Sequence, residues 1–120
     1  MAYLRREKEA LEMDYPIDVV WSAIPKAIET LKWEVEETDE QKMLIKAKTK
    51  SKLLSYASTL TIDAVSVNEK TSRVYVSAET PVTTITGIVD FGRTRERIDI
   101  FFEALVRQLI GENKESEKKA

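Results

Sequence analysis

Three arginines near the C-terminal end of the chain, Arg93, Arg95 and Arg97, have the chemistry and spacing to hold an anion. Guanidinium groups bind carboxylates and phosphates through paired hydrogen bonds. These residues fall in the first turn of an expected helix, where free backbone N–H groups and the helix dipole also attract negative charge. Because cations are otherwise unfavourable there, an anion ligand would explain their position.

The segment just before the arginines contains Gly87, Asp90 and Gly92, and two of the chain's three glycines are among them. Glycine is favoured where the backbone takes positive φ or is approached closely. The segment matches neither a phosphate-binding loop nor the dinucleotide fingerprint. Two interpretations stay open. These residues and the arginines form a ligand site, or Asp90 supports a structural turn and Thr94 caps the helix.

The composition argues against catalysis. The 120 residues contain no cysteine and no histidine, which removes thiolate chemistry, the commonest general base and the commonest metal ligand. No two carboxylates can be paired with confidence as an acid and a base, and Asp63 is notable only because it interrupts a strand pattern. We therefore expect a non-enzymatic protein with no catalytic residue, no metal site and no cofactor.

A run of lysines, the Lys42–Lys52 strip, follows a run of acidic residues between Glu34 and Glu40. One interpretation is a basic surface for nucleic acid or another acidic partner. The favoured one is a hairpin in which Glu34 and Glu36 lie opposite Lys46 and Lys48, since opposite charges stabilise neighbouring strands. The net charge of −2 gives no general attraction to nucleic acid.

The aromatic residues also have two interpretations. They could line a ligand cavity between sheet and helix, or they could pack in the core, which is the commoner role. Trp21 lies one position off the apolar stripe of its helix and is expected to border the core, and Tyr75 has the outward phase of its strand.

Apolar periodicity predicts the elements that would position these residues. Residues 8–14 suit a strand or a helix equally well. A helix follows, with Asp18 as its N-cap and a kink or break at Pro25. Strands are expected at 33–36, 43–49, 56–67, with a bulge near Val65, and 73–79. A helix over 94–110, with Gly111 at its end, comes last.

The resulting order is β-α-β-β-β-β-α, which is typical of an α+β domain with one antiparallel sheet and two helices packed on one face. That topology resembles the helix-grip folds and also one half-repeat of the TATA-box-binding protein. We expect a single domain over residues 1–111 and a disordered charged tail over 112–120.

The C-terminal pattern Gly87-x-x-Asp90-x-Gly92-x-Thr94-x-x-Arg97-Ile98-x-x-Phe101 resembles the motif of the uncharacterised family called domain of unknown function 1499. That family has Asn where this chain has Thr94, and a Ser-Arg pair where this chain has Thr84-Ile85. The resemblance implies a shared fold and brings no established activity.

These observations predict a binding or interaction domain for a small anionic or amphipathic ligand or for a protein partner. The alternative is a nucleic-acid-binding domain that uses the sheet and the Lys42–Lys52 strip. The N-terminus has no apolar signal region, so we expect a cytoplasmic monomer or weak homodimer with no membrane association.

Overall fold

The computed structural model describes residues 3–50, 57–82 and 93–119, with side chains for 7–50, 57–80 and 94–111. Five strands form one antiparallel sheet in the order β1-β5-β4-β3-β2. The elements are β1 (Tyr3–Met13), α1 (Ile17–Thr30), β2 (Glu34–Asp39), β3 (Leu44–Lys48), β4 (Thr59–Asn68), β5 (Thr71–Val82) and α3 (Arg93–Lys119). The predicted fold class and element order are confirmed.

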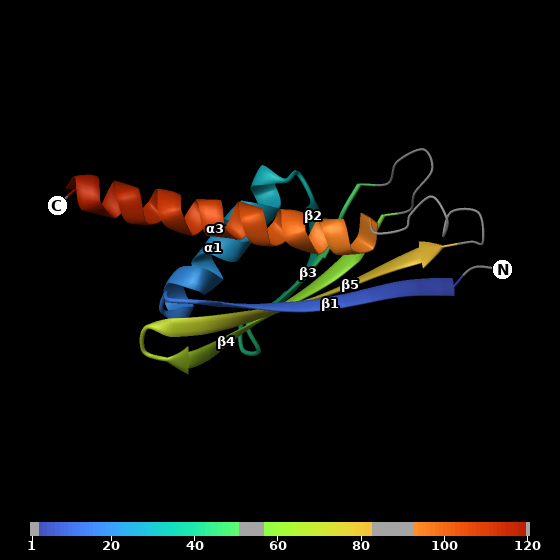
Figure 1. Ribbon diagram of the computed structural model, residues 1–120, viewed down its shortest axis with the longest axis horizontal. Coiled ribbons are helices and arrows are strands. Elements are labelled where there is room, and N and C mark those ends of the chain that lie inside the picture. The colour runs from blue at the N-terminus through green and yellow to red at the C-terminus, as the bar shows by residue number, and fades with distance from the viewer. Residues whose placement is uncertain (1–2, 51–56, 83–92, 120) are drawn as a thin grey trace.

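Both helices lie on one face of the sheet, and α3 extends past the sheet toward the C-terminus (Figure 1). With 27 residues, α3 is about 40 Å long. The inner face of the sheet and the apolar sides of the helices share one buried cluster, which includes Ile24 and Ile28 of α1, Leu60 and Ile62 of β4, and Phe101 and Leu105 of α3. The last helix therefore packs against the sheet through its apolar face.

Strict alternation along the strands decides which side chains face the helices. In β4, Leu60, Ile62 and Ala64 are buried, while the residues between them face the other side of the sheet. In β5, Val74, Val76 and Ala78 are buried in the same way. Trp21 borders this core and Tyr75 faces outward, as predicted.

Several local predictions need correction. Residues 8–14 suited a strand or a helix equally well, and 8–13 lie in strand β1, so the strand alternative is confirmed. Asp18 is not the N-cap of α1, because the helix begins directly after Pro16 and places Asp18 in its first turn. The helix is also unbroken at Pro25, which lies on its exposed side.

The end of the last helix is also corrected: α3 does not end at Gly111 but stays helical to Lys119, through the segment predicted as a disordered tail. Glutamate and lysine, which dominate this segment, are good helix formers. One glycine in a helix costs only about 1 kcal/mol, so it need not end the helix.

The acidic and basic runs do form a hairpin, with Glu34 opposite Lys48. A register shift between Val35 and Glu37 puts Glu37, not Glu36, opposite Lys46, and their charged groups are 3.6 Å apart. The sequence pattern did not reveal this bulge. The bulge expected near Val65 corresponds to a register shift between Ser66 and Asn68.

Lys32, directly after the C-cap Leu31 of α1, has φ of 60°, a left-handed conformation that costs most L-residues about 1–2 kcal/mol. We expect Lys32→Gly to raise the free energy of unfolding by about 0.5–1 kcal/mol, since relief of this strain exceeds the entropy that glycine adds to the unfolded chain. Met43 has φ of 52° but packs against the core, so Met43→Gly would remove buried surface and give no such gain. Urea denaturation of both variants checks this, and a loss of stability in Lys32→Gly would contradict it.

Candidate functional site

A polar row lies at one end of the inner face of the sheet, beneath the start of α3. Thr49 follows β3, Ser58 directly precedes β4, and Thr80 lies on β5. The three residues are side by side, and all three are buried. The amide of Thr49 donates to the Ser58 carbonyl and the amide of Ser58 donates to Thr49 Oγ1, both at 2.9 Å. The next row along the sheet is apolar, with Ala47, Leu60 and Ala78. The inner face therefore changes from polar to apolar over one row.

Arg97 brings a charge into this polar row from α3. Its side chain is only 8% exposed, and Nη1 donates to Ser58 Oγ. Ser58 Oγ is hydrogen-bonded in turn to Thr80 Oγ1, and Thr80 Oγ1 lies 3.0 Å from Thr94 Oγ1. An arginine can only donate, so Ser58 is the acceptor, which leaves its own hydrogen for Thr80. A guanidinium and three hydroxyls thus meet where α3 begins.

Two of the three predicted arginines, Arg95 and Arg97, point to different sides of α3. Arg95 lies on the exposed side of α3 and forms an ion pair with Glu9 of β1. Arg97, two residues later and so on a different side of the helix, points into the buried row. Arg93 begins α3, but its side chain lies outside the described part. Gly87, Asp90 and Gly92 also lie outside the described residues.

The predicted cap at Thr94 needs correction. The helix already includes Arg93, so Thr94 lies inside the first turn. Its hydroxyl is fully buried against Thr80 and joins the helix to β5. The Thr94 side chain therefore connects α3 to β5 by a hydrogen bond and is not a helix cap.

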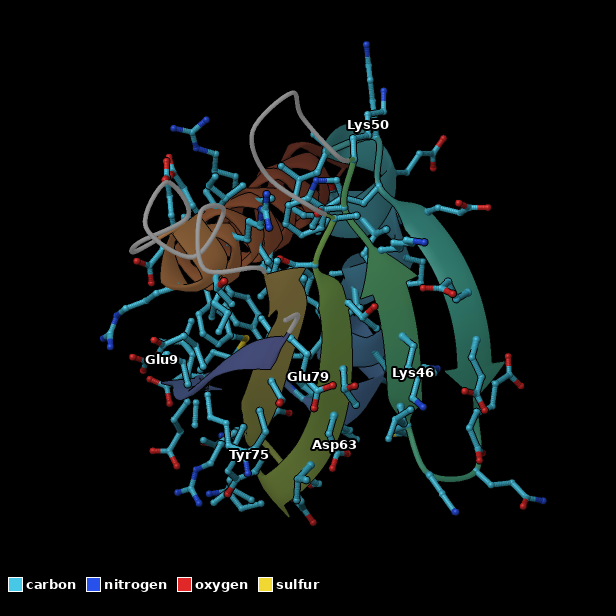
Figure 2. All side chains as sticks on the ribbon, turned by 90° about the vertical axis from the view of Figure 1, so that its right-hand side faces the viewer. Glu9, Lys46, Lys50, Asp63, Tyr75 and Glu79 are labelled. Atoms are coloured by element: carbon cyan, nitrogen blue, oxygen red, sulfur yellow. The ribbon has the colours of Figure 1, made fainter. Side chains whose placement is uncertain are left out.

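Two lysines of the Lys42–Lys52 strip lie beside acidic residues. Lys46 is paired with Glu37, and Lys48 lies opposite Glu34 in the hairpin. Asp63 on the adjacent strand β4 and Glu79 on β5, the strand beyond it, add negative charge nearby, as Figure 2 shows. Lys52 lies outside the described residues.

Sequence reasoning missed Ser58 and Thr80, although the pattern contained a signal for both. Ser58 has the same phase as Leu60 and Ile62, and Thr80 the same phase as Val76 and Ala78. A small polar residue that continues an inward-facing series indicates that the core becomes polar at that end. The predicted strand ended at residue 79, one position before Thr80.

Comparisons with known proteins place the fold. No family model and no curated protein sequence matches the chain. The resemblance to domain of unknown function 1499 therefore stays a prediction. Solved structures, in contrast, match over nearly the whole chain.

A point mutant of norcoclaurine synthase from Thalictrum flavum, in complex with a transition-state analogue, has a TM-score of 0.71 at 13% identity, covering 94% of this chain and 98% of that one. Norcoclaurine synthase has a helix-grip fold. The aromatase/cyclase Zhui from Streptomyces sp. R1128 has a TM-score of 0.63 at 10% identity, with 93% and 94% coverage. Ara h 8.0201 has a TM-score of 0.62 at 10% identity, with 91% and 99% coverage. At such low identity, the helix-grip similarity establishes the fold alone.

Two further properties concern the described residues only. None of the helices there has the length and apolar content needed to cross a membrane. No group of three acidic side chains in this part is placed to hold a metal ion.

Proposed function

We propose that this helix-grip domain binds a small amphipathic anion, such as an alkyl or aryl carboxylate, with its charged group at Arg97. The observation that carries the proposal is the meeting of the buried Arg97 guanidinium with the hydroxyls of Ser58, Thr80 and Thr94. A guanidinium taken out of water is costly unless it is paired and hydrogen-bonded. A carboxylate at this position would accept hydrogen bonds from the guanidinium and lie beside the three hydroxyls.

The neighbouring rows of the sheet suit the other half of such a ligand. Ala47 and Ala78 are small inward-facing residues directly beside the polar row, and Ile98 of α3 lies in the same core. The apolar part of a ligand bound at Arg97 would therefore lie next to apolar side chains, all three of which are fully buried.

The fold comparisons support binding of a small molecule. Two structures of norcoclaurine synthase with this fold hold small molecules, a transition-state analogue in one and dopamine with hydroxybenzaldehyde in the other. The proposed function is binding without catalysis, because the sequence lacks histidine and cysteine. No observation favours the nucleic-acid alternative, since the lysines on β3 face glutamates.

A thermal-shift comparison of octanoate with octanol tests the proposal. At ten times its dissociation constant, octanoate should raise the melting temperature by about 5 °C, since one bound ligand then adds about 1.4 kcal/mol. Arg97→Gln should reduce this shift below about 1 °C, because it removes the charge that pairs with the carboxylate.

Arg95→Gln is the matched control, because it removes the same charge from the exposed side of the same helix turn. It should keep the full octanoate shift. An equal octanoate shift in both variants would contradict the proposal, as would an octanol shift as large as that of octanoate.

A further inference from the structure

A hollow lies on the outer face of the sheet, away from the helices and separate from the polar row. Its volume is about 560 Å³, and it is lined by residues of four strands, among them Ala10 of β1, Tyr75 of β5, Thr61 and Asp63 of β4, and Leu44 of β3. Leu44, Asp63, Tyr75 and Ala10 lie opposite one another in register and form one continuous row across it. An acid therefore lies between an aliphatic and an aromatic side chain.

Asp63 has no charge partner within the described part of the chain: no side chain there forms an ion pair or a hydrogen bond with its carboxylate. The lysine on the adjacent strand, Lys46, is paired with Glu37. Asp63 is half-buried, and Figure 2 shows it on the strand next to that of Tyr75. A carboxylate in a partly apolar hollow is a strong attractor for a cation.

The ring of Tyr75 beside Asp63 is held in place. Arg73 Nη1 donates to the Tyr75 hydroxyl at 3.2 Å, and Arg73 Nη2 donates to Glu12 Oε1 at 2.7 Å. The hydrogen bonds to Tyr75 and then to Glu12 raise the pKa of Arg73, so it stays charged. With 42% of Tyr75 exposed, the ring is available to a ligand and needs little further ordering.

We propose that this hollow binds a small organic cation, a primary ammonium on an aromatic or aliphatic body. Asp63 supplies the countercharge, the face of Tyr75 a cation–π contact, and Leu44 and Ala10 the apolar walls. The other acid that lines the hollow, Glu9, is already paired with Arg95. Lys8, which also lines the hollow, lies on β1, two strands away from Asp63, and forms no ion pair with it in the described part of the chain.

An NMR titration of the ¹⁵N-labelled protein tests this site with three probes of similar shape: benzylammonium, benzyl alcohol and benzoate. Benzylammonium should shift the amides of Ala10, Leu44, Thr61 and Tyr75 with a millimolar dissociation constant. The alcohol and benzoate should bind there at least fivefold more weakly. Asp63→Asn should weaken benzylammonium at least tenfold, and Tyr75→Leu, which keeps an apolar side chain, about two- to fivefold.

Asp99→Asn is the matched control, because it removes one negative charge from an exposed position on α3, away from the hollow. It should leave benzylammonium binding unchanged. Equal binding to wild type and Asp63→Asn would overturn the proposal, and so would equal shifts with all three probes. Shifts of the same amides with rising protein concentration and no probe would also overturn it, since a second copy of the chain would then cover this face.

Discussion

Phe101→Ala is expected to lower the free energy of unfolding by about 3–5 kcal/mol, the largest effect of any single substitution considered for this domain. Phe101 is fully buried and is the largest such side chain in the described core. It projects from α3 into the apolar cluster between the helices and the sheet. Truncation removes the transfer free energy of the ring and leaves a cavity that the surrounding β-strands cannot readily fill.

The adjacent Phe102 gives an internal control for this prediction. Its ring centroid lies 6.0 Å from that of Phe101, but Phe102 is only half-buried. Phe102→Ala should therefore cost about 1–2 kcal/mol, in proportion to the apolar area it covers. Urea denaturation of both variants measures the difference, and equal losses would show that α3 is packed differently against the sheet.

Ser58→Ala is expected to cost about 2 kcal/mol, the second-largest effect. The substitution removes one acceptor of the Arg97 guanidinium and one partner of Thr80, both within the buried row. Hydrogen bonds to charged groups contribute about 1.5–3 kcal/mol, and a buried donor left unsatisfied is costly. Ser77→Ala on the outer face of β5 makes the same chemical change outside this row and should stay within about 0.5 kcal/mol of wild type.

A double-mutant cycle separates this contact from general effects at the site. If Ser58 and Arg97 interact as described, Ser58→Ala combined with Arg97→Met should cost less than the sum of the single losses, by at least about 1 kcal/mol. Additive losses would mean that the two side chains contribute independently.

Much of the fold follows from the sequence because its strands and helices have clear periodicity. Val74, Val76 and Ala78 alternate with polar residues, and this phase is the one that faces the helices. The stripe of Ile98, Phe101, Leu105 and Leu109 likewise turns α3 toward the sheet. Together with the order of the elements, these patterns predict an antiparallel sheet that the two helices cover on one face.

Features that depend on tertiary contacts could not be predicted in the same way. The bulge that moves Glu37 opposite Lys46 is a choice of register, and a run of glutamates fits either register equally well. The end of α3 was missed because glycine was taken as a stop signal, although the residues beyond it favour helix.

The candidate site was predicted only in part. Arg97 was predicted from its position in the chain. Which of the arginines at 93, 95 and 97 faces the sheet depends on the rotation of α3 about its axis, which the sequence alone does not give. That rotation buries Arg97 on Ser58 and leaves Arg95 on the exposed side with Glu9. A side chain two positions away on a helix points in a nearly opposite direction, so spacing alone could not bring the right one to the hydroxyls.

The most direct test of the central proposal, that the polar row binds an amphipathic anion, is an isotope-filtered NOE spectrum of the ¹³C-labelled protein with unlabelled octanoate. The methylenes next to the carboxylate should give NOEs to the methyl groups of Thr80 and Thr94, and the far end of the chain should give NOEs to Ile98. NOEs confined to residues of the outer face, such as Leu44 and Ala10, would contradict the proposal, as would their complete absence at saturating octanoate.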